Sequence, residues 1–364
     1  MQNLLKKNLL VLILVFFVIG VIIGKAIDDY VSLNSISNYN QSIIYDVQNN
    51  VQELIHIKNP SDIISKRNAL VSYIWKDKVF PTFVPTQIEK NISDSDFIKL
   101  ENLKQIDKMT IKMDYNVNST AYLFLPAKSN NQLVIYHHGH DGGFINGKKT
   151  IQFFLKNNYP VLAFSMPLTG MNSQPIVELG NEGKIKFISH NLFSHFDSDR
   201  FSSIKFFVEP VAVSLNYVQQ NYEFDEYYMV GLSGGGWTTT LYSAIDPRIT
   251  KSYSIAGSLP LYLRYSQADI GDYEQILPDL YRITNYLELY IMDSYGNNRA
   301  HVQIFNKYDP CCFADPAIDT YQNIIKLTLK NLGQGDFSIY IDDTHKEHKI
   351  SDHALQIILE RMKE

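Results

Sequence analysis

The sequence predicts an α/β fold with a doubly wound, mostly parallel sheet, interrupted by cap insertions and preceded by a membrane-anchor helix. From about residue 100 onward, strand-like segments alternate with helix-like segments, a pattern typical of a parallel sheet with helices on both faces. Several strand-like segments, such as 133–137, are short continuous apolar runs, as expected for strands that are buried on both faces. The third observation is an apolar run at residues 9–23.

That N-terminal run predicts a signal anchor over residues 1–27. Lys6 and Lys7 precede it, and its length lies between a short transmembrane helix and the apolar core of a signal peptide. The lysines should stay cytoplasmic, which places the rest of the chain on the extracytoplasmic side. The alternative is a cleaved signal peptide and a secreted or periplasmic protein.

Composition excludes several classes of protein. The 364 residues are 45% hydrophobic and 20% charged, as in ordinary globular proteins. The net charge of −5 argues against nucleic-acid binding. The two cysteines, Cys311 and Cys312, are adjacent, so a disulfide framework and a cysteine-rich metal site are excluded. We expect them to be small buried side chains, although whether they pair stays open.

Residues 28–100 are expected to form a helical N-terminal region, with a helix that opens at Ser61 or Asp62 and ends near Trp75. Residues 101–364 then form the catalytic domain. Its expected strands are 109–115, 121–125, 133–137, 161–164, 227–230, 252–256, 302–305 and 337–341. Its expected helices are 148–157, 203–221, 234–245, 319–331 and 351–364. Two irregular insertions, 167–199 and 258–298, are long enough to cover a site.

The strongest motif is the G-x-S-x-G sequence at Gly231–Gly235. An apolar strand precedes it and a helix of small residues follows it, which predicts a tight turn with Ser233 exposed at its tip. The alternatives are a glycine-rich turn with an idle serine, or a phosphate-binding loop. The chain has no P-loop sequence and no well-formed G-x-G-x-x-G after its first strand, so we expect no cofactor.

A nucleophilic serine needs a base, and the base needs an orienting acid, in the chain order serine, acid, histidine. Asp309 follows the strand at 302–305, at the edge of the sheet where ligand sites gather, while Asp293 and Asp315 are weaker candidates. Two histidines after the last strand compete as the base. His348 lies directly before the final helix, and His345 is the alternative.

The strand at 133–137 runs into a loop that contains His138, Gly139 and His140. This arrangement suits one of the two backbone donors that stabilise an oxyanion. We expect these donors to be the amides of Gly234 and His140. The neighbouring histidines also suggest a metal site, but the sequence shows no second ligand cluster to complete it, so no metal is expected.

These residues resemble the α/β-hydrolase superfamily from about Lys108 to the C-terminus. The resemblance rests on the His138-Gly139 loop, the elbow at Gly231–Gly235, Asp309, and a histidine after the last strand. It implies a serine hydrolase in which Ser233, Asp309 and His348 are nucleophile, acid and base, although His345 leaves the base open.

Carboxylesterase-like or lipase-like cleavage of a small-molecule, lipid or glycan ester is the expected function. Acyl transfer to an alcohol and hydrolysis of a peptide bond are alternatives on the same fold. An inactive scaffold with this fold is the alternative from another class, and a fluorophosphonate probe would leave it unlabelled.

Overall fold

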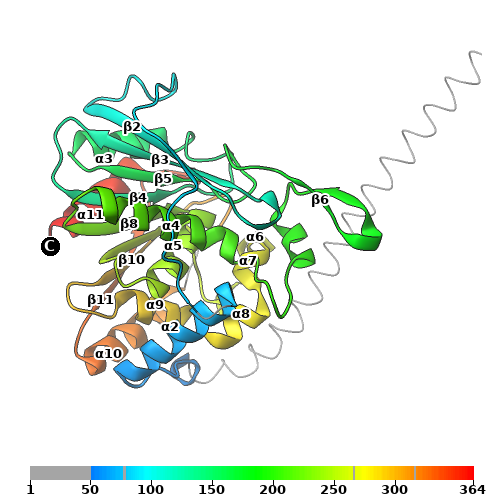
Figure 1. Ribbon diagram of the computed structural model, residues 1–364. Coiled ribbons are helices and arrows are strands. Elements are labelled where there is room, and N and C mark those ends of the chain that lie inside the picture. The colour runs from blue at the N-terminus through cyan, green and yellow to red at the C-terminus, as the bar shows by residue number, and fades with distance from the viewer. Residues whose placement is uncertain (1–50, 77–78, 265–266, 315–316) are drawn as a thin grey trace, which may run out of the picture. The chain divides into compact units, whose positions relative to one another are not determined.

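The computed structural model describes residues 51–76, 79–264, 267–314 and 317–364 (Figure 1). The predicted anchor at residues 1–27 lies outside these ranges. Within them, no helix is both long and apolar enough to cross a lipid bilayer. The chain from Val51 onward forms one compact unit.

A nine-stranded sheet lies at the centre of the described unit, in the order β1-β2-β3-β5-β4-β8-β9-β10-β11. Neighbouring strands from β5 to β11 are all parallel, and β1, β2 and β3 pair antiparallel at one edge. This confirms the predicted mostly parallel sheet. The strands are β1 (Gln87–Glu89), β2 (Leu103–Ile111), β3 (Ser119–Pro126), β4 (Gln132–His137), β5 (Val161–Phe164), β8 (Glu226–Leu232), β9 (Lys251–Ile255), β10 (Ala300–Asn306) and β11 (Asp336–Asp342).

Helices cover both faces of this sheet. They are α2 (Pro60–Trp75), α3 (Lys148–Lys156), α4 (Lys205–Asn221), α5 (Gly234–Ile245), α6 (Gln267–Ile270), α7 (Tyr273–Ile276), α8 (Pro278–Ile283), α9 (Tyr286–Ser294), α10 (Gln322–Leu332) and α11 (Asp352–Lys363). Short 3₁₀ turns are η1 (Val51–Leu54), η2 (Asp114–Asn116), η3 (Gly180–Glu182), η4 (His190–His195), η5 (Leu261–Leu263) and η6 (Ile318–Thr320).

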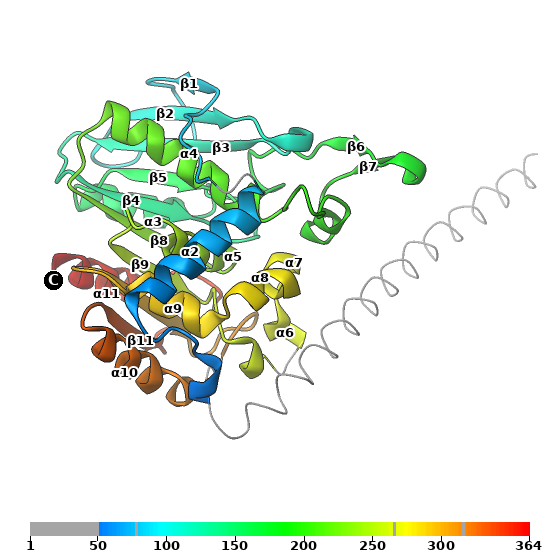
Figure 2. The same cartoon turned by 60° about the horizontal axis from the view of Figure 1, so that its bottom comes forward.

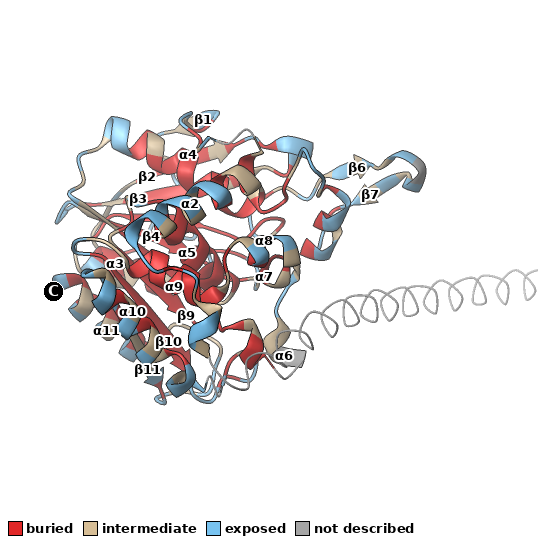
Figure 3. Ribbon diagram, turned by 90° about the horizontal axis from the view of Figure 1, so that it is seen from below, coloured by how far each residue is buried: buried red, intermediate tan, exposed pale blue. Residues whose placement is uncertain are grey.

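Alternation of side chains along each strand divides the core between the two faces. On β4, Val134 and Tyr136 join a buried cluster with side chains of α3 and α11. Leu133 and Ile135 are fully buried on the other face, where α5 contacts β4, β8 and β9. Every residue of α5 is buried, as Figure 3 shows, so this helix is surrounded by protein.

The described part of the predicted N-terminal region belongs to the same unit. Helix α2 contacts α5 and α8 (Figure 2), and β1 pairs with β2. The N-cap of α2 is Asn59 rather than Ser61 or Asp62, because its side chain accepts hydrogen bonds from the backbone N–H groups of both these residues.

One part of the first predicted insertion projects from the unit, and another part packs against the second insertion. A hairpin of β6 (Ile176–Glu178) and β7 (Lys184–Lys186) projects from the body of the unit (Figure 1). The η4 turn that follows the hairpin contacts α7 of the second insertion. The two insertions therefore meet beside the sheet.

Candidate active site

Ser233 lies at the turn between β8 and α5, with φ of 56° and ψ of −126°. A positive φ is unfavourable for a residue with a side chain, and it persists where the surrounding structure determines it. Here the Ser233 N–H donates to the carbonyl of Ile255, and the Ser233 carbonyl accepts from the N–H of Trp237. The local sequence therefore produces the predicted tight turn between strand and helix, with Ser233 at its tip.

Two glycines permit the close approach of backbones at this elbow. A Cβ on Gly231 would lie 2.1 Å from the carbonyl oxygen of Gly235. A Cβ on Gly235 would lie 2.1 Å from the carbonyl oxygen of His137. Because both obstacles are backbone atoms, neither position has room for a side chain.

Asp309 and His348 meet although they are distant in sequence. The Nδ1 of His348 lies 2.7 Å from Oδ2 of Asp309. The other carboxylate oxygen, Oδ1, accepts hydrogen bonds from the backbone N–H groups of Cys311 and Cys312, at 2.8 and 3.1 Å. Burial raises the pKa of Asp309, but the hydrogen bonds from His348 and from these amides outweigh it and hold the pKa below its usual range.

Ser233 and His348 line one pocket of about 330 Å³. The Nε2 of His348 is buried and has no hydrogen-bond partner among the described residues. Ser233 and His348 make no direct hydrogen bond, as is common for catalytic pairs without substrate. The other lining residues are His140, Asp141, Ala256, Gly257, Gly271, Asp272, Gln275, Cys311, Cys312 and Phe313.

The alternative base, His345, lies elsewhere. Its Nε2 is 3.4 Å from Oδ2 of Asp342, and its Nδ1 accepts a hydrogen bond from the N–H of Glu347. His345 is not among the residues that line the pocket with Ser233. Of the weaker acid candidates, Asp293 lies 3.1 Å from His301, and Asp315 lies outside the described residues.

The expected oxyanion donors lie beside Ser233. Gly234 is the first residue of α5, and a Cβ on Gly139 would lie 2.8 Å from the Cβ of Ser233, so the loop that carries His140 passes directly over the elbow. The amides of Gly234 and His140 donate to no other protein group among the described residues. Both are therefore available to a ligand oxygen.

The other histidines of this loop brace it. His137 Nδ1 lies 3.0 Å from the carbonyl oxygen of His138. His138 lies between the hydroxyl of Tyr136 and the carboxylate of Asp141, at 2.6 and 2.7 Å. Burial lowers the pKa of His137 to about 4, so this ring is neutral near pH 7.

His140, in contrast, contacts residues that the sequence analysis did not single out. Its Nε2 lies 3.1 Å from Glu274, 3.1 Å from Asp272 and 3.2 Å from His190. Burial lowers the pKa of His140, but these carboxylates outweigh it and raise the pKa. Burial raises the pKa of Glu274, but the two histidines reverse this and hold its pKa far below the usual range. No local pattern identifies this cluster, because its members belong to three separate segments.

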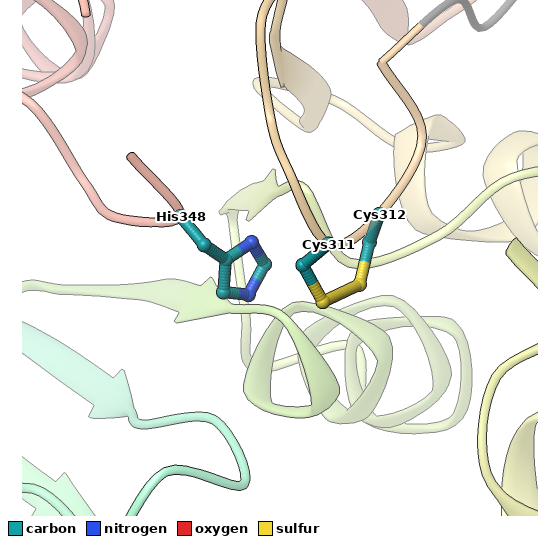
Figure 4. Close-up of side chains that lie close together, drawn as sticks. All are labelled: Cys311, Cys312 and His348. Carbon is teal, nitrogen blue, oxygen red and sulfur yellow. A yellow bond between two sulfur atoms is a disulfide. The ribbon is translucent and has the colours of Figure 1, made fainter. Parts of the chain in front are cut away.

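The expectation of two buried cysteines is wrong, because Cys311 is exposed and Cys312 is only half-buried. A disulfide links Cys311 to Cys312, and both residues lie beside the imidazole of His348 (Figure 4). The physical reason is the turn around Asp309. Its carboxylate accepts from both cysteine amides and so keeps this loop at the pocket instead of in the core.

No family model and no curated protein matches the sequence, but solved structures resemble this one. An acetyl xylan esterase from Paenibacillus sp. R4 has a TM-score of 0.57 and 13% identity over 86% of this chain and 97% of that one. Acetyl Xylan Esterase 1 from Thermoanaerobacterium sp. JW/SL YS485 has a TM-score of 0.54 and 14% identity, over 85% and 96%. The esterase Pf2001 from Pyrococcus furiosus has a TM-score of 0.50 and 16% identity, over 78% and 98%.

These similarities extend over most of each chain. Because the sequence identities are low, they show the fold alone. The mostly parallel sheet and the tight turn after β8 are those that the sequence resemblance predicted. The chain therefore has the α/β-hydrolase fold.

Proposed function

We propose that the protein is a serine hydrolase that cleaves an ester through an acyl-enzyme, with Ser233 as nucleophile, His348 as base and Asp309 as orienting acid. One observation carries the proposal. A serine on a strained elbow opens onto the same pocket as an imidazole whose far nitrogen lies 2.7 Å from a buried carboxylate. That combination activates a hydroxyl, which is otherwise a poor nucleophile.

In the proposed mechanism, Ser233 attacks the carbonyl carbon while Nε2 of His348 takes its proton. Asp309 accepts the Nδ1–H of His348 and so selects the tautomer whose Nε2 is free. The oxyanion accepts hydrogen bonds from the backbone N–H groups of Gly234 and His140. Each such donor contributes a factor of about 10²–10³ in rate. His348 returns the proton to the leaving alcohol, and water then cleaves the acyl-enzyme by the same steps.

The pocket supports an uncharged substrate with a short acyl group. Its volume of about 330 Å³ is near the lower end for small-molecule sites. Phe313, Ala256 and the disulfide supply apolar lining, while the carboxylate of Asp141 is exposed. This negative charge disfavours anionic substrates. The two acetyl xylan esterases of similar fold agree with a short acyl group on a sugar-like alcohol.

Esterase activity of the full-length chain on nitrophenyl acetate, butyrate and octanoate tests this proposal. Ser233→Ala should lower kcat on the order of 10⁶-fold, with a similar loss for His348→Ala. His345→Ala is the matched control, since it removes a neighbouring histidine that does not line the pocket. A wild-type protein that neither cleaves esters nor takes a fluorophosphonate label at Ser233 would leave the scaffold alternative standing.

Anchoring of this enzyme to a membrane through residues 1–27, with its catalytic domain on the extracytoplasmic side, stays a prediction from the sequence.

A further inference from the structure

Four side chains converge beside the pocket from three segments. His140 belongs to the loop after β4, His190 begins η4 in the first insertion, and Asp272 and Glu274 lie at the start of α7 in the second. Nε2 of His140 lies 3.1 Å from Oε1 of Glu274, 3.1 Å from Oδ2 of Asp272 and 3.2 Å from Nδ1 of His190. Nδ1 of His190 lies 3.1 Å from Oε2 of Glu274.

With His190 neutral, hydrogen atoms alone do not satisfy this arrangement, so either a second proton on His190 or a metal ion must join its Nδ1 to Glu274. Nε2 of His190 lies 2.9 Å from the carbonyl oxygen of Pro167, which can only accept, so that nitrogen carries the hydrogen. In the neutral ring, Nδ1 then presents a lone pair to a carboxylate oxygen. His140 meets a similar difficulty, because a single N–H cannot point at three acceptors that surround Nε2 at almost equal distances.

A metal ion among these atoms removes both difficulties. Zinc bonds of about 2.0–2.1 Å to nitrogen and oxygen in a tetrahedron place its ligands about 3.3–3.4 Å apart. Nε2 of His140 lies 3.2 Å from Nδ1 of His190, and each of these nitrogens lies 3.1 Å from a different carboxylate oxygen of Glu274, which is close to that value. The side chain of Glu274 is 0% exposed and that of His190 5%, and such a buried carboxylate between two imidazoles is a stronger ligand set than an exposed acidic patch.

From this geometry we propose that His140, His190 and Glu274 bind one Zn²⁺ ion, because one ligand atom of each lies within 4.8 Å of the other two. Three protein ligands leave a fourth tetrahedral position, which water or Asp272, 3.1 Å from Nε2 of His140, can fill. The hydrogen bond from His190 to Pro167 orients a ligand histidine as outer-shell partners usually do. The side chain of Asp272 is available for that fourth position, because Asp272 occupies the N-cap position of α7 but makes no capping hydrogen bond with its side chain.

The proposed ion fastens both insertions to the loop that carries one of the expected oxyanion donors. A Cβ on Gly234 would lie 2.2 Å from Cε1 of His140, so the ring of this ligand packs directly over the residue after the nucleophile. Zinc would therefore fix the position of the cap relative to Ser233 without taking part in the acyl transfer.

The test measures metal binding, not esterase activity. The full-length protein is purified without a polyhistidine tag, stripped with a chelator and titrated with Zn²⁺ alone. We expect one zinc ion per chain and a higher melting temperature with zinc. His190→Ala and Glu274→Gln should weaken binding by at least the ~10–100-fold that removal of an outer-shell partner costs. His195→Ala is the matched control, because His195 lies on the same turn and contacts Glu182 instead.

X-ray absorption on the wild-type zinc protein provides a second measurement that no folding defect can affect. The proposal expects only nitrogen and oxygen neighbours at about 2.0–2.1 Å. A sulfur neighbour would place the metal at Cys311, Cys312 and His348, the other group of ligand atoms in the described residues, and would overturn the assignment. The assignment would also be overturned if the protein bound no zinc, or if both His190→Ala and Glu274→Gln left the zinc affinity unchanged. In either case protons alone would join the cluster.

Discussion

Replacing Asp309 by Asn tests the proposed catalytic pair while keeping the shape of the side chain. Oδ1 of Asp309 accepts the amides of Cys311 and Cys312, and Oδ2 faces Nδ1 of His348. The amide oxygen of asparagine can keep the two backbone hydrogen bonds, which leaves its NH₂ facing His348. Since an NH₂ group only donates, the imidazole must present a lone pair at Nδ1 and carry its hydrogen at Nε2. It can then no longer accept the proton of Ser233.

The wrong tautomer of the base lowers kcat by about 10⁴-fold in serine hydrolases with this arrangement. At about 1.36 kcal/mol for each factor of ten, this corresponds to about 5.4 kcal/mol in the activation barrier. We expect this loss in kcat for nitrophenyl acetate, with circular dichroism and a melting curve showing that the variant is folded.

Asp342→Asn is the matched control for Asp309→Asn. Asp342 is the carboxylate that lies 3.4 Å from the other histidine, His345. Its replacement should leave kcat within about tenfold, a change of ~1.4 kcal/mol. If Asp342→Asn abolished activity while Asp309→Asn kept it within about tenfold, His345 would be the base and the assignment of His348 would be refuted.

Three further predictions concern the elbow, a buried histidine and the disulfide. Gly231→Ala places a Cβ 2.1 Å from a backbone oxygen and should cost more than ~3 kcal/mol in urea unfolding. Gly180→Ala, which has open space but a positive φ, should cost about 1–2 kcal/mol, and equal losses would contradict the packing argument. Burial lowers the pKa of His301 from 6.5 to about 3. Between these two pH values the unfolded state binds a proton that the folded state does not. The free energy of unfolding therefore falls as the pH drops below 6.5, by up to about 1.4 kcal/mol per pH unit. His301→Phe should flatten that slope in urea midpoints measured between pH 7 and 4, and an unchanged slope would assign it to other groups. Replacing Cys311 and Cys312 together by Ser should keep kcat/KM within about tenfold, ~1.4 kcal/mol, because backbone amides rather than sulfur atoms hold Asp309, the proposed acid. A larger loss in the same assay would show that the sulfurs are needed.

The sequence by itself determined the elements that depend on local patterns. The predicted helix at 234–245 and the strand at 161–164 have the same bounds in the structure. Glycines mark the start of the helix, and a continuous apolar run identifies the strand. Helix α10 starts at Gln322 instead of residue 319, since the η6 turn precedes it. The strand predicted at 109–115 is displaced further, since β2 spans Leu103–Ile111 and the η2 turn occupies Asp114–Asn116. These differences left the predicted mostly parallel sheet intact.

Only the tertiary structure decided which side chains meet. His345 and His348 lie three residues apart in one segment, and the sequence offered either as the base. Folding placed His348 beside Asp309 and His345 beside Asp342, because the register of β10 against β11 sets where each loop emerges from the sheet.

The cluster around His140 depends on folding even more strongly. Its partners His190 and Glu274 lie 50 and 134 residues further along the chain, within two insertions that have no regular period. Local sequence patterns report which face of a helix or strand is buried, but they carry no information about which insertion packs against which loop. That contact exists only once the sheet and both insertions have assembled around the pocket.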